Sequence, residues 1–271
     1  MCSFGKNSEL YIKARSRDGI TLLEDVYFTA PYKIAKPFFN NDKGILELVL
    51  MAASAGIMQG DRYEIKMELS PYARVSLCGQ SYSKVHRMKE GYASQTNTFI
   101  LEEGAFLDYA PKPSIPFSDS SYHAVTDCFL SSGSAFLYSD ILACGREKSG
   151  ERFQFKDFRN CLRVHYNDEL IYLDHQRYIP AGQKLEGIGF FEGYTHQATL
   201  GYFSDHLPDN LCDDLYAILS NIKGIDFGVS KTYKYGVAVR ILGCSGDMLE
   251  TVLAYIRKKA RNNSLLKCQN R

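Results

Sequence analysis

LEEGAFLDY, residues 101–109, recurs in outline at LSPYARVSL, residues 69–77, and at LSSGSAFLY, residues 130–138. Each segment begins with Leu, turns through Pro or Gly, and carries apolar residues six and eight positions after that Leu. The three starting leucines lie 32 and 29 residues apart. Strand–turn–strand units repeated at such intervals predict stacked layers of β-structure, as in a solenoid or a sandwich.

Alternation of apolar and polar residues extends this prediction over the first two thirds of the chain. It is clear in ELYIKARS (9–16) and DRYEIKMELS (61–70), as expected for half-buried strands. The segment 152–178 predicts two strands around a turn at Asn167–Asp168. The 19 Tyr and 16 Phe residues also favour strands over helices.

The last quarter of the chain changes character. DNLCDDLYAILSNI (209–222) and SGDMLETVLAYIRKKA (245–260) place apolar residues at helical spacing, and VAVRILG (237–243) between them predicts a strand. Asp209 is the expected N-cap of the first helix.

Together these patterns predict a mainly β fold in a single domain over residues 1–271. Stacked, β-helix-like strand layers are expected over about 1–205. A small C-terminal α/β portion with two helices, in the order helix–strand–helix, is expected over about 206–265. No Pro/Ser-rich linker separates the two portions.

The charge of the chain and the absence of targeting segments limit its possible partners and location. The formal net charge of +1 gives no global field for nucleic acid or an anionic membrane. The first residues lack the apolar core of a signal peptide, and the longest apolar stretch, residues 48–58, is too short to span a bilayer. We therefore expect a cytoplasmic protein whose eight cysteines are reduced.

Motifs of common enzyme chemistry are missing. The sequence has no P-loop, no dinucleotide fingerprint after a strand and no G-x-S-x-G elbow. Its six histidines form no H-x-H or H-x-x-x-H pair, and its cysteines form no C-x-x-C pair, so a permanent metal site is not expected. Cys144 lies near Arg146, but its apolar neighbours favour a buried thiol over a reactive one.

Four loops remain that are rich in residues with special roles. They are SAGIMQGD (54–61), SYSKVHRM (81–88), YAPKPSIPF (109–117) and SDILACGREKSGE (139–151). Rigid loops with few titratable groups favour binding over turnover, so these loops predict a recognition surface.

These four stretches resemble the urease accessory protein D family, called UreD or UreH. The family's small-Gly-x-x-x-Gly-Asp loop is matched by Gly56, Gly60 and Asp61, although Ala55 stands where the family usually has a first Gly. Its Lys-x-aromatic-Arg pattern is matched by Lys84 and Arg87, with His86 in the aromatic slot. YAPKPSIPF matches the Pro-rich segment, and the last run is matched by Asp140, Gly145, Arg146, Gly150 and Glu151.

The resemblance implies a non-enzymatic maturation factor with a helix-like stack of strands and two helices. Members of the family bind apo-urease and UreF, which recruits the GTPase UreG, so a hetero-oligomer dimerised through partners is implied. Nickel(II) in transit is thought to cross a polar tunnel in UreD. No cofactor is held permanently, and GTP enters only through the partner GTPase.

Within that resemblance, Asp61, Asp140 and Asp174 are our candidates for a transient nickel path, because carboxylates bind nickel(II) loosely enough to release it. The residues expected to bind partners or to form the tunnel wall are Gly56, Gly60, Lys84, His86, Arg87, Arg146 and Glu151.

Two alternatives come from other functional classes. One is a β-rich hydrolase that uses Asp61 with His86 or His175. The other is a carbohydrate-binding β-sandwich with a Tyr-rich surface, which the absence of Trp disfavours. Turnover by the isolated chain or glycan binding would distinguish them.

Overall fold

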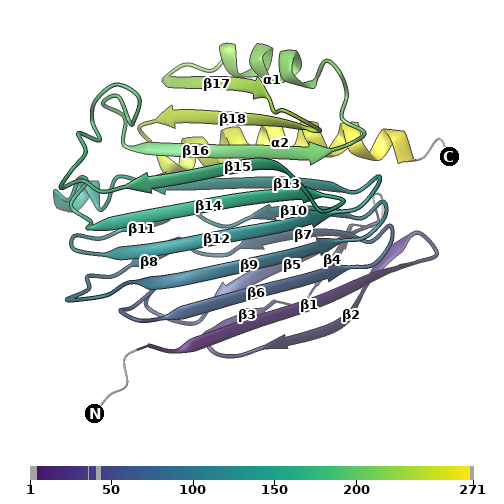
Figure 1. The fold of residues 1–271 in the computed structure, drawn as a ribbon, viewed down its shortest axis with the longest axis horizontal. Coiled ribbons are helices and arrows are strands. Elements are labelled where there is room, and N and C mark those ends of the chain that lie inside the picture. The colour runs from purple at the N-terminus through teal and green to yellow at the C-terminus, as the bar shows by residue number, and fades with distance from the viewer. Residues whose placement is uncertain (1–4, 36, 41–43, 269–271) are drawn as a thin grey trace.

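A computed structural model describes residues 5–35, 37–40 and 44–268. Figure 1 shows two β-sheets stacked face to face, with two helices at the C-terminal end. Among the described residues, seven strands form the sheet nearer the viewer, which we call the front sheet. In spatial order these are β15 (Glu169–Tyr178), β14 (Asp157–Tyr166), β12 (Ser121–Leu130), β9 (Ala93–Leu101), β6 (Arg62–Leu69), β1 (Asn7–Arg17) and β2 (Ile20–Phe28).

Eleven strands of the described residues form the second sheet, which we call the back sheet. Its main path is β17 (Ile225–Lys231), β18 (Gly236–Gly243), β16 (His196–Ser204), β13 (Ala135–Ala143), β10 (Phe106–Ala110), β7 (Arg74–Gly79), β5 (Ile45–Ala52) and β3 (Tyr32–Ile34). Three short strands join it at the side: β4 (Phe38–Asn40), β8 (Ser83–Val85) and β11 (Ser114–Pro116).

The chain alternates between the two sheets, and this alternation makes the fold a solenoid. β6, β9, β12 and β14 pair in parallel in the front sheet, while β5, β7, β10 and β13 pair in parallel in the back sheet. Parallel neighbours require that each coil return to the same edge before the next begins. The predicted β-helix-like stack is therefore confirmed.

The repeat that predicted this fold is the corner between the sheets. Leu69, Leu101 and Leu130 stack in register as the last residues of three front strands. The third residue after each Leu has a positive φ: 61° at Tyr72, 63° at Gly104 and 70° at Gly133. The same left-handed turn therefore recurs at each coil and directs the next strand into the back sheet.

The apolar positions of the repeat form the core between the sheets. Val75, Leu107 and Phe136, six residues after the starting leucines, lie side by side in register. All three are fully buried. Burying such side chains contributes about 1.5–3 kcal/mol each, so the repeat stabilises the stack as well as shaping it.

A second core covers the outer face of the back sheet. The helices α1 (Leu211–Ser220) and α2 (Gly246–Cys268) pack there, through Leu215 of α1 and Leu249 and Ile256 of α2. The helix α2 is also held by Asp108, a fully buried carboxylate on the outer face of β10 that pairs with Arg257 and Arg261. A single short 3₁₀ helix, Glu147–Ser149, lies among the described residues before α1.

Two predictions about the C-terminal portion were wrong. Its order is helix–strand–strand–helix, because Ile225–Lys231 forms β17, which pairs with β18 and continues the back sheet. Ile225, Phe227 and Val229 alternate with polar or small residues, so the signal for this strand was present and was overlooked. The residue at the N-cap of α1 is Asn210 rather than Asp209, and Asn210 makes no side-chain capping hydrogen bond.

Other local predictions hold. The hairpin turn lies at Asn167 and Asp168, whose φ values are 46° and 66°. Cysteines whose side chains the structure describes are free thiols, at positions 78, 128, 144, 161, 212 and 244. Cys2 and the side chain of Cys268 lie outside the described residues.

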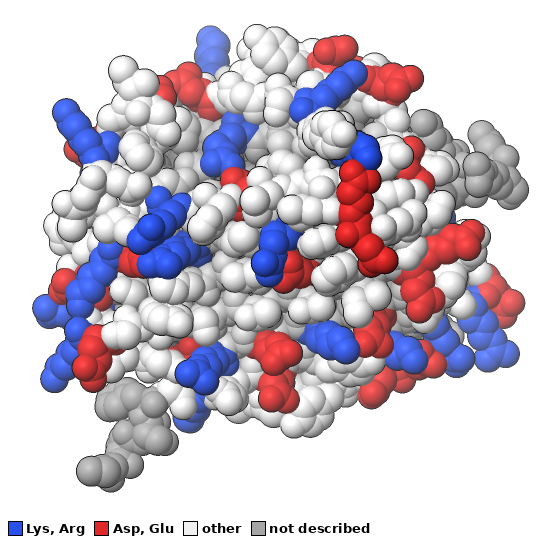
Figure 2. Space-filling model, viewed as in Figure 1, with Lys and Arg blue, Asp and Glu red and all other residues white. Residues whose placement is uncertain are grey.

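The exposed face of the front sheet carries both signs of charge. Figure 2 shows Lys and Arg interspersed with Asp and Glu over this face. The pair Arg163–Asp127, at 2.6 Å, and the pair Lys66–Glu68, at 2.8 Å, lie on it. This mixture agrees with the formal net charge of +1.

Candidate functional site

The glycine loop and the basic loop are joined at one edge of the solenoid. Backbone hydrogen bonds of 2.8 Å from Ile57 N to Lys84 O and of 2.9 Å from His86 N to Ile57 O connect them. The bonds make Ile57 and Val85 a parallel bridge. Two loops that the sequence separates by some twenty residues are thus one structural unit.

Gly56 makes this contact possible. Its φ is 147°, and a Cβ at this position would lie 2.5 Å from Lys84 O and 2.7 Å from the His86 ring. Only glycine allows so close an approach. Gly60, with φ of 77°, has a related role, because its carbonyl oxygen lies against Gly5.

An aromatic and ionic wall extends from His86. The His86 ring meets the Phe117 ring edge-on at 4.9 Å, and the Arg146 guanidinium lies 4.1 Å above the same Phe117. Arg146 Nε donates to Glu151 Oε2 at 2.8 Å, and this hydrogen bond lowers the pKa of Glu151. Arg87 pairs with Asp119 at 2.9 Å. These contacts hold three motif loops in one arrangement.

Asp61 closes the glycine loop. Its carboxylate accepts hydrogen bonds from Met58 N at 2.8 Å, from the Tyr63 hydroxyl at 3.0 Å and from Lys6 N at 3.3 Å. Only 9% of Asp61 is exposed. Burial, with a further contribution from the Asp61 charge, raises the pKa of Tyr63, which therefore stays a neutral donor.

A cavity of about 530 Å³ opens between the joined loops, and we call it the loop mouth. Gly56 and Lys84 line its outer part, and Tyr63 and Gln95 line its inner part. Tyr63 and Gln95 are paired neighbours on β6 and β9 and point between the two sheets. The loop mouth therefore leads from the motif loops toward the interior.

A row of polar side chains crosses the interior from there. Gln95 accepts a hydrogen bond from Tyr122 at 2.8 Å and donates to Asn97 at 2.9 Å, and Asn97 donates to Thr126 at 2.9 Å. Gln95 also lies 3.4 Å from the hydroxyl of Tyr109. Such residues interrupt an otherwise apolar core, and each finds a partner, as buried polar groups must.

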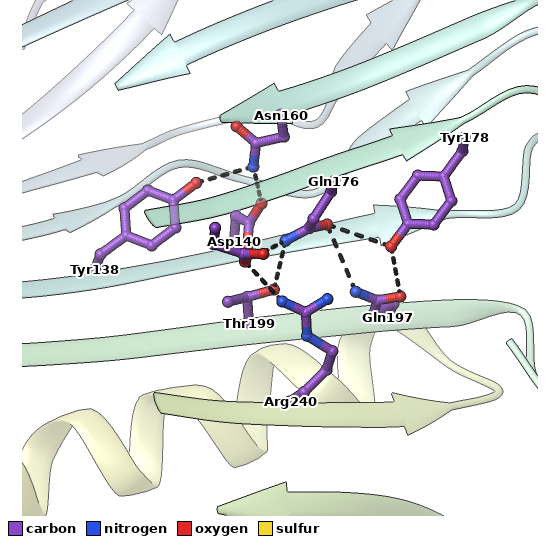
Figure 3. Close-up of polar contacts among 9 residues, drawn as sticks. Tyr138, Asp140, Asn160, Gln176, Tyr178, Gln197, Thr199 and Arg240 are labelled. Carbon is purple, nitrogen blue, oxygen red and sulfur yellow. Dashed lines mark hydrogen bonds and ion pairs between the residues drawn. The ribbon is translucent and has the colours of Figure 1, made fainter. Parts of the chain in front are cut away.

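The row continues into the C-terminal coils. Tyr109 lies beside Tyr138, with ring centroids 6.2 Å apart. Asn160 donates to the Tyr138 hydroxyl at 3.2 Å and to Asp140 Oδ2 at 2.6 Å. Figure 3 shows Tyr138, Asp140 and Asn160 pointing toward one another from the two sheets. The row ends in a polar cluster that we call the Asp140 cluster.

The Asp140 cluster contains a second carboxylate and one cation. Gln176 donates to Asp174 at 2.9 Å and to Thr199 at 3.2 Å. Arg240 donates to Asp174 Oδ2 at 2.6 Å. Tyr178 donates to Gln197 at 2.8 Å at the side of the cluster. β13, β14, β15, β16 and β18 all contribute side chains to the cluster (Figure 3).

Asp140 differs from the other members of the Asp140 cluster in its hydrogen bonding and in its pKa. Its Oδ1 is buried and has no hydrogen-bond partner among the described residues. Burial, and then the nearby charge of Asp174, raise the pKa of Asp140 to about 6. Strongly shifted pKa values cluster at functional sites, so the raised pKa makes Asp140 a candidate functional residue.

A second cavity lies beside the Asp140 cluster, and we call it the edge groove. Its volume is about 570 Å³, and Thr199, Arg240, Tyr172 and Gly228 are among its lining residues. The front sheet ends at β15, which covers β16, while the back sheet continues through β18 and β17, so the inner face of β18 and β17 extends beyond the front sheet. The polar row thus runs between the loop mouth and the edge groove.

The candidate site residues therefore occupy two places. Asp140 and Asp174 share the Asp140 cluster, whereas Asp61 belongs to the loops. The residues expected in a partner surface or tunnel wall gather at the loop edge: Gly56, Gly60, Lys84, His86, Arg87, Arg146 and Glu151. Their predicted roles in binding and nickel transfer remain predictions.

Sequence reasoning missed most of the interior polar row. Asn160, Gln176 and Thr199 occupy inward positions of β14, β15 and β16, and the other inward residues of β14 are apolar. A polar residue at a buried position of an alternating strand is the signal that would have found them. Arg240 gives the same signal within the apolar strand 237–243.

The hydrolase alternative requires Asp61 to lie beside His86 or His175, and the described part of the structure does not pair these residues. Among the described residues, no hydrogen bond or ion pair joins Asp61 to His86 or His175. His86 Nε2 lies 3.1 Å from Ala55 O, and His175 is exposed on β15. Cys144 is buried, which raises the pKa of its thiol to about 11 and confirms the prediction of an unreactive side chain.

Metal ligands and membrane spans were also considered within the described residues. No three His, Cys, Asp or Glu side chains converge there in a way that would hold a metal ion. In the same part of the chain, no helix combines the length and apolar character needed to cross a bilayer.

Substituting Gly56 tests the contact between the loops. Gly56→Ala places a Cβ against Lys84 O and forces a strained φ, so we expect a loss of about 2–3 kcal/mol in unfolding free energy. Denaturant unfolding measures it. Gly91→Ala is the control, because Gly91 has a positive φ but open space around its Cβ position. Equal losses in the two variants would contradict a specific role for the contact.

The chain was compared with known proteins. Residues 6–271 match a family model described as UreD urease accessory protein. Urease accessory protein UreD of Acetivibrio thermocellus is 54% identical over 254 residues, which cover 94% of this chain and 97% of the relative. Urease accessory protein UreH of Helicobacter hepaticus is 33% identical over 92% of this chain and 96% of its own length.

A third relative, urease accessory protein UreD of Flavobacterium johnsoniae, is 33% identical over 93% of this chain and 91% of its own length. All three names describe accessory proteins of an enzyme, in agreement with the prediction that this chain is a maturation factor rather than an enzyme. With a family model over nearly the whole chain and close relatives of the same length, this chain belongs to the UreD urease accessory protein family.

Proposed function

We propose that this urease accessory protein binds apo-urease and UreF and conducts nickel(II) toward the urease active site. UreG, recruited through UreF, supplies the nickel and the GTP hydrolysis. The chain itself acts as a cytoplasmic scaffold and conduit and transforms no substrate.

The polar row through the solenoid is the observation that carries this proposal. It begins at Tyr63 and Gln95, which line the loop mouth, and it ends at Arg240, which lines the edge groove. Burying polar groups in a β core costs free energy, because each group must lose its water and find a hydrogen-bond partner. A row of such groups therefore calls for a functional reason. A polar interior with a cavity at each end supports transfer of an ion through the stack.

The chemistry of the row suits loose binding of nickel(II). Nickel(II) is bound by nitrogen and oxygen donors, and tight sites use several imidazoles or thiolates. The row offers phenol, amide and hydroxyl oxygens, with two carboxylates in the Asp140 cluster. Oδ1 of Asp140, which has no hydrogen-bond partner in the described part of the chain, is the donor most available to a passing ion.

The motif loops have a mechanical role in this proposal. Gly56 and Lys84 line the loop mouth, and the stack of His86, Phe117 and Arg146 supports it from the side. Hydrogen-bonded ion pairs with planar Arg geometry fix such walls well. A partner that binds these loops would therefore release nickel(II) directly into the loop mouth.

Co-purification with UreF and apo-urease, followed by activation with nickel(II), GTP and UreG, tests the proposal. We expect a stable complex and activation that requires both the chain and GTP. Full activation without this chain would contradict the proposal. So would a chain that associates with neither UreF nor apo-urease when all are co-expressed.

A further inference from the structure

Arg240 stands at the end of the polar row, where the row meets solvent. Its Nη2 donates to Asp174 Oδ2 at 2.6 Å, and its side chain is 42% exposed in the edge groove. We propose that Arg240 is a built-in counter-cation that occupies the nickel path and is displaced by each passing ion. This inference rests on the proposed conduit and adds the residue that keeps the conduit from trapping its cargo.

Charge balance supports an exchange between Arg240 and the ion. With Asp140 and Asp174 ionised and Arg240 engaged, the cluster carries one net negative charge. A divalent cation added to that arrangement leaves one positive charge in a partly buried space. If Arg240 withdraws, two carboxylates balance the divalent cation and the cluster is neutral. Electrostatics at short range therefore favours one occupant, either the guanidinium or the ion.

The structure provides space for the withdrawn side chain. The edge groove of about 570 Å³ adjoins Arg240 on its solvent side. The residue that pairs with Arg240 on β17 is Gly228, and the space beside this glycine is open. An Arg side chain reaches water from such a position while its stem stays on the sheet. Movement of Arg240 into the edge groove therefore needs no change in the strands.

This arrangement explains how two carboxylates can pass an ion without keeping it. Asp140 and Asp174 alone would form a site attractive to any divalent cation, because two partly buried carboxylates lie near enough to interact electrostatically. The tethered guanidinium competes with the ion for Asp174 at a high effective concentration. The affinity of the two carboxylates for nickel(II) is therefore lower, and the ion leaves the Asp140 cluster faster.

Nickel(II) binding to the full chain tests the inference. In Arg240→Met the competitor is removed, so we expect roughly tenfold tighter binding of nickel(II) by isothermal titration and slower release to a chelator. Arg240→Lys keeps a cation and should bind about as weakly as the wild type. Adding Asp140→Asn to Arg240→Met should remove the gain, which would place the ion at the Asp140 cluster.

Arg163→Met is the matched control. Arg163 pairs with Asp127 at 2.6 Å, with side-chain exposures of 44% and 16%, against 42% and 15% for Arg240 and Asp174. This pair lies on the outer face of the front sheet, away from the polar row. Its loss should leave nickel(II) binding unchanged. A gain of equal size in Arg163→Met would overturn the inference.

Variants of Arg240 that bind nickel(II) more tightly should activate urease more slowly. Arg240→Met is expected to bind the ion more tightly and yet to activate urease several-fold more slowly. Loss of folding would show as weaker binding of nickel(II) and a lower melting temperature, and Arg240→Gln then provides a second neutral variant. Weaker or unchanged binding in both neutral variants would overturn the inference.

Failure of this inference can be told apart from failure of the conduit. If Asp140→Asn lowers urease activation while the neutral Arg240 variants behave as the wild type, the conduit stands and the counter-cation role is wrong. If Asp140→Asn leaves activation unchanged, Asp140 takes no part in nickel transfer and a conduit through the Asp140 cluster is wrong.

Discussion

Asp140→Asn is expected to lower nickel-dependent activation of urease by roughly tenfold or more while the chain still assembles with its partners. The substitution keeps the size of the side chain but removes the charge of a partly buried carboxylate, whose Oδ1 has no hydrogen-bond partner among the described residues. Activation is measured with reconstituted UreF, UreG and apo-urease, and assembly by co-purification. Normal activation by Asp140→Asn would contradict a role for this carboxylate in nickel transfer.

The same variant should be more stable than the wild type at neutral pH. The pKa of Asp140 rises from 3.8 to about 6 in the folded chain, chiefly because of burial and then because of Asp174. Ionised Asp140 therefore costs up to about 3 kcal/mol above pH 6, as the shift of about two pKa units implies. Below pH 3.8 the group is protonated in both states and the cost vanishes.

Unfolding by denaturant from pH 4 to pH 8 checks this expectation. The advantage of Asp140→Asn should grow as pH rises through the interval from 3.8 to about 6 and then stay constant. Asp127→Asn serves as the control, because Asp127 pairs with Arg163 on the outer face of the front sheet. A variant that is less stable than the wild type at pH 8 would show that Asp140 is structural.

Asp108→Asn is expected to destabilise the chain by about 3–5 kcal/mol, because breaking a buried ion pair leaves uncompensated charge. Asp108 is fully buried and accepts hydrogen bonds from Arg257 at 2.7 and 3.0 Å and from Arg261. Both arginines lie on α2, and Arg261 also donates to Ser76 at 2.8 Å. Their loss should free the C-terminal half of α2 from the back sheet.

Denaturant unfolding and hydrogen exchange of α2 measure this effect. The control is again Asp127→Asn, whose pair is partly exposed and should contribute about 1 kcal/mol or less. Equal losses in the two variants would contradict the anchoring role of Asp108. The N-terminal end of α2 has its own contact, because the Tyr82 hydroxyl lies within hydrogen-bond distance of Asp247 at 2.6 Å and of Glu250 at 2.8 Å. The loop mouth, which Tyr82 lines, is therefore linked to α2.

The sequence predicted the architecture because the solenoid is built from local signals. The Leu-turn-apolar repeat, seen at 69–77, 101–109 and 130–138, is the same corner used three times. Alternation assigned the inward face of β1 and β6 correctly, since side-chain direction follows from backbone geometry alone. The extra strand β17 was missed although Ile225, Phe227 and Val229 alternate in the same way.

The loops illustrate an intermediate case. Their residue types predicted unusual turns, and Gly56 indeed has a φ that residues other than glycine rarely adopt. Their partners could not be predicted from spacing. Arg146 lies over Phe117, and Arg87 pairs with Asp119, only because successive coils place these loops at one edge.

By itself, the sequence determined a stacked β architecture with a helical C-terminal portion, and its loop motifs identified the family. Only the tertiary structure brought Asp140, Asp174 and Arg240 together, from strands up to a hundred residues apart, and left Asp140 Oδ1 without a hydrogen-bond partner within the residues that the structure describes. The physical reason is that periodicity fixes which way each side chain points. Which groups meet, and how strongly their charges interact there, depends on the register between distant strands and on burial.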